Sequence, residues 1–338
     1  MNNCDFFSSP IGLGHVTRDI AIVKNMKDFS VNFVTGSGAA KILKKLNYNI
    51  DDVYNPPSFV VENGVLNNQT KWLWNYYQYD KNCKNISEKI IKKNNSELVI
   101  SDEDFASLTI AQEVKIPNIL ITDVLETKFT KGIASFIEKK MNKSMMNIIK
   151  NCDIVIIPEN GENVDNIRRV GPIVREINFS REELREKFLF NKKTILISVG
   201  GTDAGLFLIQ KSIESILKLS LDIEIILVTG PSITKKFDNV KNLGFVDNLH
   251  ELIYASDVVI SLAGKSTIDE AKAYGTPGIF IPIKDHFEQE NNSKNEGFIF
   301  DDINKLDELI LEKLDKKRNK VNTNGAKLAA EIIRKFTK

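Results

Sequence analysis

The sequence predicts an α/β fold with two Rossmann-like domains, each a doubly wound parallel sheet. Short apolar runs recur along the chain, and most carry apolar residues at consecutive positions, as parallel strands buried on both faces do. Segments of helical period lie between these runs, and this alternation is typical of right-handed βαβ units. The length of 338 residues suits two domains that each bury a core.

The apolar runs fall into two series, separated by a charged stretch that carries Gly171 and Pro172. We expect the first series of strands at 4–8, 31–35, 98–101, 118–122 and 154–157. The second series is expected at 194–199, 223–228, 258–262 and 278–281. This pattern predicts an N-terminal domain over 1–165 and a C-terminal domain over 166–321. A final helix over 322–338 is expected to pack back on the first domain.

Composition excludes several classes of protein. The apolar fraction of 42% and the charged fraction of 27% are ordinary for a soluble globular protein. A formal net charge of +1 gives no electrostatic reason to expect a nucleic acid partner. The cysteines form no C-x-x-C pair, which argues against disulfides and structural zinc. Since the N-terminus lacks a signal-peptide pattern and no apolar run reaches the roughly 20 residues that span a bilayer, we expect a cytoplasmic protein, with a peripheral membrane contact left open.

A glycine loop follows the first expected strand and opens a helix. Gly12 and Gly14 let the backbone turn tightly and approach a ligand closely. A dinucleotide site is not expected, because Thr17 replaces the third glycine and no acidic residue ends the second strand. His15 begins the helix, and we interpret it as a general base because imidazole titrates near physiological pH. The structural alternative is a helix-start histidine that bonds to nearby backbone.

A general base needs an orienting acceptor, and Asp102 is the candidate. It ends the strand at 98–101, so it lies at the same carboxyl edge of a parallel sheet as the His15 loop. There it can accept a hydrogen bond from the imidazole Nδ1–H. One alternative is a helix cap. Another reads Asp102 and Asp104 as a metal-chelating D-x-D pair, but the nucleotide pattern described next argues against it, and we expect no metal.

The stretch 243–292 is the most informative part of the chain. A strand breaks at Gly264 and restarts as a helix, which directs free backbone N–H groups and the positive helix end at one point. That arrangement suits a phosphate. Glu270 lies one turn further on and can accept hydrogen bonds from ribose hydroxyls, so the segment predicts a nucleotide diphosphate site. The alternative for Glu270 is a solvated helix carboxylate.

Together these motifs resemble the GT-B glycosyltransferases, and most of all the branch that holds the family 28 enzymes and the lipid II-forming N-acetylglucosaminyltransferase. The G-H-x-x-R form of the first loop also resembles the UDP-sugar hydrolase of the pseudaminic acid pathway. The likeness covers nearly the whole chain, is strongest over 243–293 and is poor over 54–95. It implies two domains facing a cleft and a metal-independent, inverting transfer from a UDP-sugar, without a cofactor.

The resemblance also implies which residues bind the UDP-sugar. Uracil would lie against Phe245 and Val246, the ribose on Glu270, and the donor sugar on Gln289. The α-phosphate would lie on the helix start after Gly264, and the glycine loop that begins at Gly200 would face the diphosphate. The residue chemistry adds four candidates to this implied set, Gly12, Gly14, Arg18 and His286. The complete candidate set is Gly12, Gly14, Arg18, Gly200, Gly201, Thr202, Phe245, Val246, Gly264, Lys265, Ser266, Thr267, Glu270, His286 and Gln289. Arg18 has the alternative of pairing with a nearby carboxylate, and Gly200 and Gly201 that of a tight strand-to-helix turn.

The acceptor is expected on the first domain, as a hydroxyl of a glycan or of a lipid-linked molecule. The aromatic residues of 71–80 can stack on sugars, lie at a membrane interface or fill the core. The segment 133–150 is amphipathic and basic, so it can lie on an anionic bilayer or cover a sheet. Two other functions stay open, a UDP-sugar hydrolase or epimerase on the same fold and a non-catalytic nucleotide-sugar-binding protein. The sequence gives no oligomeric state.

Overall fold

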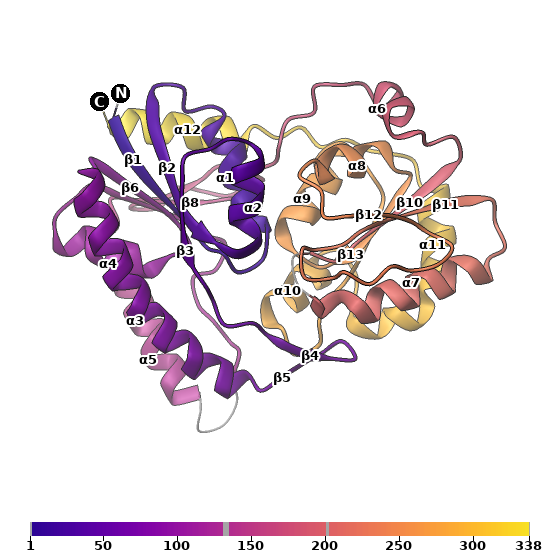
Figure 1. The fold of residues 1–338 in the computed structure, drawn as a ribbon, viewed down its shortest axis with the longest axis horizontal. Helices are drawn as coiled ribbons and strands as arrows, with labels where there is room; N and C mark the ends of the chain where they lie inside the picture. The colour runs from indigo at the N-terminus through magenta and orange to yellow at the C-terminus, as the bar shows by residue number, and fades with distance from the viewer. Residues whose placement is uncertain (1, 131–134, 201–202, 338) are drawn as a thin grey trace. The chain divides into compact units, whose positions relative to one another are not determined.

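The computed structural model describes residues 2–130, 135–200 and 203–337 (Figure 1). The chain divides into two compact units. The first unit comprises residues 1–59, 68–174 and 323–338, and the second comprises 60–67 and 175–322. The main division thus falls after Val174 and not at 165/166, because β9 (Ile167–Arg169) pairs with β8 (Ile154–Ile157) and belongs to the first sheet.

The first unit is built on a parallel sheet with the strand order β3-β2-β1-β6-β7-β8-β9. The remaining strands are β1 (Asn2–Ser8), β2 (Phe29–Gly36), β3 (Ile50–Tyr54), β6 (Leu98–Asp102) and β7 (Asn118–Ile121). Phe6, Ile100 and Leu120 are fully buried, which explains the continuous apolar runs of the central strands. The edge strands β3 and β9 carry polar residues, so the apolar pattern did not predict them.

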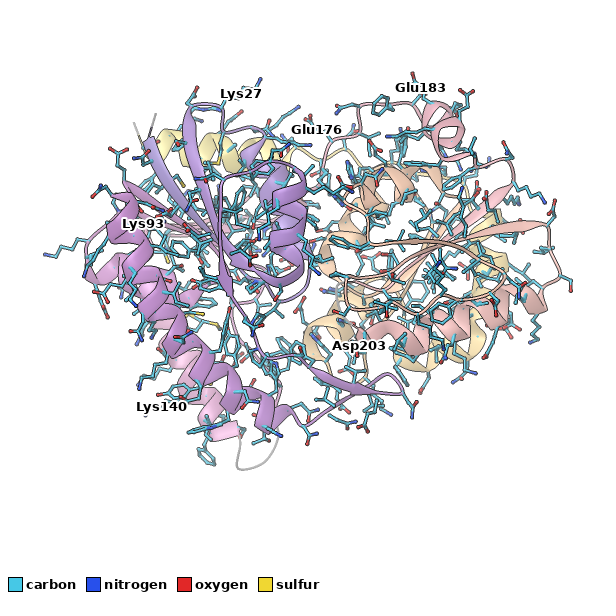
Figure 2. The ribbon with its side chains drawn as sticks, in the orientation of Figure 1. Lys27, Lys93, Lys140, Glu176, Glu183 and Asp203 are labelled. Atoms are coloured by element: carbon cyan, nitrogen blue, oxygen red, sulfur yellow. The ribbon has the colours of Figure 1, made fainter. Side chains whose placement is uncertain are left out.

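The helices of the first unit are α1 (Gly14–Val23), α2 (Ser37–Lys45), α3 (Gln69–Asn94), α4 (Phe105–Glu113), α5 (Ser135–Asn151) and α12 (Gly325–Phe336). The last of these comes from the end of the chain and packs against α1. Arg334 in α12 donates a hydrogen bond to the Asn25 carbonyl at 2.8 Å. The side chains of Lys93 on α3 and Lys140 on α5 extend outward from the unit (Figure 2).

The second unit has a parallel sheet with the order β12-β11-β10-β13-β14. Its strands are β10 (Lys193–Ser198), β11 (Ile223–Val228), β12 (Lys241–Gly244), β13 (Val258–Leu262) and β14 (Gly278–Ile281). Its helices are α6 (Arg181–Phe188), α7 (Leu206–Lys218), α8 (Leu249–Ala255), α9 (Lys265–Tyr274), α10 (Phe287–Asn295) and α11 (Leu306–Asp315). Among the residues placed in the structure, no helix combines the length and the apolar character needed to cross a membrane.

A short antiparallel hairpin from the N-terminal half of the sequence completes the second unit. It consists of β4 (Val60–Glu62) and β5 (Val65–Asn67). The Leu66 N–H donates to the Lys284 carbonyl, and the Lys284 N–H donates to the Gly64 carbonyl, both at 2.9 Å. Gly64 has a φ of +82°, and a Cβ there would lie 2.7 Å from Phe300 and 2.8 Å from Phe207, so only glycine fits.

Candidate active site

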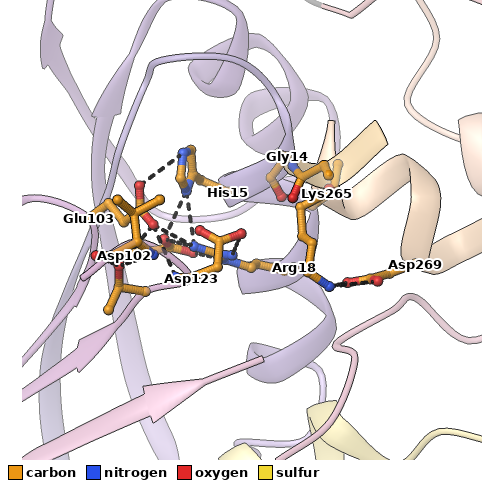
Figure 3. Close-up of polar contacts among 12 residues, drawn as sticks. Gly14, His15, Arg18, Asp102, Glu103, Asp123, Lys265 and Asp269 are labelled. Carbon is orange, nitrogen blue, oxygen red and sulfur yellow. Dashed lines mark hydrogen bonds and ion pairs between the residues drawn. The ribbon is translucent and has the colours of Figure 1, made fainter. Parts of the chain in front are cut away.

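The carboxyl edge of the first sheet gathers the loops that follow β1, β6 and β7. Ser8 in β1 pairs with Asp102 in β6, and Asp102 pairs with Ile121 in β7. The Ser9 N–H donates to the Asp102 carbonyl at 2.9 Å, which fixes the start of the glycine loop. This register brings together side chains that are far apart in sequence, namely His15, Arg18, Asp102, Glu103 and Asp123 (Figure 3).

The structure brings the predicted base and its predicted orienting carboxylate into contact. His15 Nδ1 lies 2.9 Å from Asp102 Oδ1, and Asp102 is fully buried. Because a carboxylate accepts but does not donate, a neutral imidazole in this contact carries its proton on Nδ1. Nε2 is then the nitrogen that can take a proton. The helix-cap alternative for Asp102 is wrong, since Asp104 caps α4 by accepting a hydrogen bond from the Ser107 N–H at 2.9 Å.

Arg18 is bound by carboxylates. Its Nε and Nη2 each lie 2.5 Å from an oxygen of Asp102, and its Nη1 lies 3.3 Å from Asp123 Oδ2. The side chain is buried, so the guanidinium compensates the charges of these two carboxylates inside the protein. Of the two interpretations of Arg18, the structure has the pairing with a nearby carboxylate.

Burial and charge together set the protonation of the cluster. Burial lowers the pKa of His15, but the charges of Asp102 and Glu103 outweigh it and raise the pKa to about 9. Burial raises the pKa of Asp102, but the charges of Arg18 and His15 outweigh it and hold the pKa below its ordinary value. Burial and the charge of Asp123 raise the pKa of Glu103 well above its ordinary value. Asp102 is therefore the fixed negative charge beside the imidazole.

A further carboxyl group, Asp19, lies behind this cluster. It is fully buried, and the Ser8 hydroxyl donates to its Oδ2 at 2.5 Å. Burial and the charge of Asp102 raise its pKa well above the ordinary value. The surroundings of Asp19 therefore favour its protonated form, which reduces the repulsion between two neighbouring carboxyl groups.

One group of ligand atoms in this cluster has the spacing of a metal site. His15, Asp102 and Glu103 each offer one ligand atom, and these atoms lie within 4.8 Å of one another. The Arg18 guanidinium already contacts both oxygens of Asp102, so a cation of the protein itself occupies the place next to that carboxylate. Asp104 is directed into the α4 cap, so Asp102 and Asp104 do not form a D-x-D pair here.

In the second unit, the predicted phosphate site is the start of α9. Gly264 is the N-cap, and Lys265, Ser266 and Thr267 form the first turn, where amides have no partner within the helix. The Lys265 Nζ lies 2.7 Å from both oxygens of Asp269, one turn further along the same helix (Figure 3). A phosphate at this helix start would compete with Asp269 for the Lys265 ammonium.

Glu270 is held by an arginine that the sequence analysis missed. Arg175 Nε donates to Oε1 at 2.7 Å and Nη2 donates to Oε2 at 3.1 Å, and both side chains are buried. Arg175 also donates to the Asp247 carbonyl at 3.0 Å, and the Tyr274 hydroxyl donates to the Arg175 carbonyl at 2.7 Å. Glu270 is thus a buried, oriented carboxylate, and the solvated alternative is wrong. A carboxylate has about four lone-pair sites, so the two that Arg175 uses leave acceptors for a ligand.

The other predicted donor residues lie on the loops around these helices. His286 is the N-cap of α10, and burial lowers its pKa to about 4, so it is neutral at pH 7. The Gln289 side-chain oxygen accepts a hydrogen bond from the Ile283 N–H at 3.1 Å. Phe245 and Val246 follow β12 and are half-buried.

The predicted glycine loops follow β1 and β10, and the structure describes the glycines of the first loop and Gly200 of the second. Gly12 and Gly200 have φ values of +81° and +82°, which glycine adopts without strain, and Gly14 begins α1. Gly201 and Thr202 lie outside the described residues.

Comparison with known proteins identifies relatives for both halves. Residues 194–338 match the glycosyltransferase family 28 C-terminal domain. An uncharacterised glycosyltransferase of Methanopyrus kandleri is 27% identical over 218 residues, which are 61% of this chain and 62% of that protein's length. The UDP-N-acetylglucosamine–N-acetylmuramyl-(pentapeptide) pyrophosphoryl-undecaprenol N-acetylglucosamine transferase of Clostridium botulinum is 28% identical over 359 residues, covering 96% of each chain.

The fold also has solved counterparts. The crystal structure of the kitacinnamycin glycosyltransferase superposes with a TM-score of 0.65 at 12% identity and covers 99% of this chain and 98% of its own. At this identity the likeness shows the fold alone. The predicted fold class, two Rossmann-like parallel-sheet domains of the GT-B type, is confirmed, and the predicted resemblance to family 28 glycosyltransferases is confirmed as well.

Proposed function

We propose that this chain, a glycosyltransferase with the GT-B fold and a family 28 C-terminal domain, moves a hexose or N-acetylhexosamine from a UDP-sugar to a hydroxyl acceptor with inversion. One observation carries the proposal. His15 Nδ1 is bonded at 2.9 Å to the buried Asp102, which leaves Nε2 as the proton-accepting nitrogen. A histidine held in this way is suited to activate a hydroxyl.

In the proposed reaction, the acceptor oxygen attacks the anomeric carbon and its proton moves to His15 Nε2. The bond from the anomeric carbon to the β-phosphate oxygen breaks, and its electron pair leaves with UDP on the opposite face. Asp102 stabilises the imidazolium that forms. The helix start after Gly264 stabilises the charge on the departing phosphate, because its amides and dipole are fixed in advance. These groups supply the charge stabilisation themselves, so we propose a reaction without a metal or cofactor.

The proposed donor contacts extend the assignments made from the sequence. Glu270 would accept the ribose hydroxyls, and Arg175 would hold its carboxylate in place through two hydrogen bonds. Uracil would lie against Phe245 and Val246, and Gln289 would contact the donor sugar. Because the Gln289 oxygen is bonded to the Ile283 N–H, its amide nitrogen is the group directed to sugar hydroxyls in this proposal.

We propose more specifically that the hydroxyl acceptor is linked to a lipid. The Clostridium botulinum relative is named for a pyrophosphoryl-undecaprenol acceptor. On the first unit, Trp74 of α3 is 60% exposed and Phe136 of α5 is 73% exposed, whereas Trp72 is buried and stacks on Phe59 with ring centroids 4.3 Å apart. The Lys139 Nζ lies 5.7 Å from the Phe136 ring centroid, and exposed aromatic residues beside basic ones are typical of a membrane interface. We therefore propose cytoplasmic chemistry with a peripheral contact to an anionic bilayer.

UDP release separates the functional alternatives. The purified protein would be incubated with a panel of UDP-sugars, with and without vesicles that carry a polyprenyl-linked saccharide. Release that depends on the acceptor supports transfer, and release in water alone supports the hydrolase alternative, in which His15 activates water. Binding without release supports the non-catalytic alternative. If calorimetry detects no binding of any UDP-sugar, the proposed function is wrong.

A further inference from the structure

Lys265, the first residue of α9, lies at an electrostatically unfavourable place. The positive end of a helix dipole stabilises anions and disfavours cations, so a lysine in the first turn costs energy unless an anion is near. The first turn of α9 contains no acidic residue. Its N-cap is Gly264, which has no side chain to accept hydrogen bonds from the first amides. The start of α9 therefore has positive potential from the backbone and from a side chain.

The ammonium of Lys265 is paired with Asp269, one turn further along the same helix (Figure 3). Nζ lies 2.7 Å from each carboxylate oxygen. The Asp269 side chain is 8% exposed and that of Lys265 is 19% exposed, so both charges depend on each other for compensation. An i,i+4 pair with the cation nearer the helix N-terminus is the less favourable of the two orders. The pair is thus a weak contributor to the stability of the helix itself.

The helix start has room for an anion. A Cβ built on Gly264 would meet no atom of the described residues within 4 Å, its neighbours in the chain aside. Side chains of a helix lean toward its N-terminus, and lysine has a flexible four-carbon stem, so Nζ can turn from Asp269 toward the first amides. A phosphate at this place would accept hydrogen bonds from the backbone and from the ammonium together.

We propose that Asp269 is a positioning residue that competes with the diphosphate for Lys265, whose ammonium moves from the carboxylate to the phosphate when the UDP-sugar binds. The inference rests on the proposed function, in which the α-phosphate lies at the start of α9. The exchange replaces one ion pair by another and breaks no covalent bond. Because Asp269 stays buried when the ammonium leaves, part of the binding energy is used to separate the pair. The pair forms again as UDP is released.

The other charged side chains of α9 are placed differently. Glu270 accepts two hydrogen bonds from Arg175. Lys272 lies in the last turn, with its Nζ 2.7 Å from Glu296 Oε1. Since α9 is described from end to end, Lys265 is the one cation of this helix at its start.

The affinity for UDP, measured by calorimetry, tests the competition. Asp269→Asn keeps the shape of the side chain and removes its charge, so Lys265 no longer has to leave a carboxylate. UDP should then bind about three- to tenfold more tightly. Lys265→Met should weaken UDP binding about tenfold, as the loss of a hydrogen bond to a charged group does. A pair that only stabilised the helix would leave the UDP affinity unchanged in Asp269→Asn.

The double variant separates competition from simple repulsion. In the Lys265→Met background, Asp269→Asn should change the UDP affinity about twofold or less, because only the screened repulsion of a charge one turn away remains. An equal gain with and without the lysine overturns the proposal. Glu296→Gln is the matched control, since Glu296 pairs with Lys272 at 2.7 Å at the other end of α9, and it should leave the UDP affinity in place.

A crystal structure of the unchanged protein with UDP tests the exchange even if the variants do not fold. Lys265 Nζ should lie within hydrogen-bond distance of a phosphate oxygen and beyond about 4 Å from Asp269. Bound UDP with the Lys265–Asp269 contact retained overturns the proposal, and the proposed function stands.

Failure of the proposed function is recognised separately. If the unchanged protein binds neither UDP nor any UDP-sugar, that function is wrong, and pyrophosphate becomes the probe in the same four proteins. Tighter pyrophosphate binding in Asp269→Asn that depends on Lys265 would still support the competition. Equal pyrophosphate affinities, or no pyrophosphate binding, would overturn the role of Asp269 as well.

Discussion

The two candidate sites of this protein differ in the chemical groups that form them. In the first unit, the groups around His15 are ionisable side chains that come from the ends of three strands and compensate one another's charge. In the second unit, the candidate phosphate site is a helix start made of backbone, and the two buried carboxylates of that helix, Asp269 and Glu270, are paired with Lys265 and Arg175. The first arrangement can move a proton, and the second can hold a nucleotide without changing its own charge.

The largest effect on the reaction rate is expected from the substitution His15→Ala, which tests the difference between the two sites. Removing a general base typically costs about 10²–10⁴-fold in rate, so UDP release should fall by that factor. Affinity for the UDP-sugar should stay the same, because the proposed nucleotide contacts lie in the second unit. Rate assays and thermal shift with a UDP-sugar check the two halves of this prediction.

Lys93→Ala, at an exposed position on α3, is the control for that experiment and should have no effect on rate. An equal loss of rate and of donor affinity in His15→Ala would show that His15 contributes to binding, and the division of labour between the two units would be incorrect.

The next largest effect is expected in the second unit, from Arg175→Ala. This variant leaves the Glu270 carboxylate buried without its partner, which typically costs about 3–5 kcal/mol of stability. In chemical denaturation the variant should therefore unfold at a lower denaturant concentration than the unchanged protein. It should also lose UDP-sugar binding. Lys187→Ala provides the comparison, since its pair with Glu251 is at the surface and should contribute no more than about 1 kcal/mol. Equal stability of the two variants would mean that Glu270 does not depend on Arg175.

The pH dependence of the reaction rate should follow the protonation of His15 in the first unit. A general base must be neutral, and the pKa of His15 is raised to about 9, so the fraction of competent protein rises as the pH rises toward 9. Below that midpoint the rate should fall about tenfold for each pH unit. UDP-sugar binding measured by calorimetry should change much less over the same range. A rate that is level between pH 6 and 9 would show that His15 is not the base.

The smallest effect is expected from metal removal. The ligand atoms of His15, Asp102 and Glu103 lie within 4.8 Å of one another, but Arg18 already compensates Asp102. EDTA should leave UDP release unchanged, and added Mn²⁺ should not raise it. Loss of activity in EDTA with recovery in Mn²⁺ would identify the cluster as a metal centre. The two sites would then differ in that the first depends on a metal ion.

The two sites also differ in how well a single sequence predicts them. The helix start of the second unit is contiguous, so its strand, its glycine and its helix can be read from one stretch. Asp102 could be paired with His15 because both follow strands of one parallel sheet. Glu103 and Asp123 were missed, since their roles depend on a positive φ and on the register of β7 with β6, neither of which leaves a pattern in the sequence.

Arg175 shows the same limit over a longer separation. It lies 95 positions from Glu270 along the chain, in a charged stretch that reads as a domain junction. The central strands were predictable because they are apolar at consecutive positions, but the edge strands β3 and β9 were not, because polar residues interrupt their pattern. The fold determines which distant charged residues pair, so no local sequence pattern predicts these pairs.

The β4–β5 hairpin has a consequence for how this polypeptide can be made and divided. Since 60–67 belongs with 175–322, cutting the gene after Val174 would give a C-terminal fragment without the segment that covers Phe207 and Phe300. During synthesis the hairpin leaves the ribosome more than two hundred residues before Lys284, whose backbone it bonds. The hairpin must therefore wait without its backbone partner until Lys284 has been synthesised, and the second unit cannot complete its folding before then.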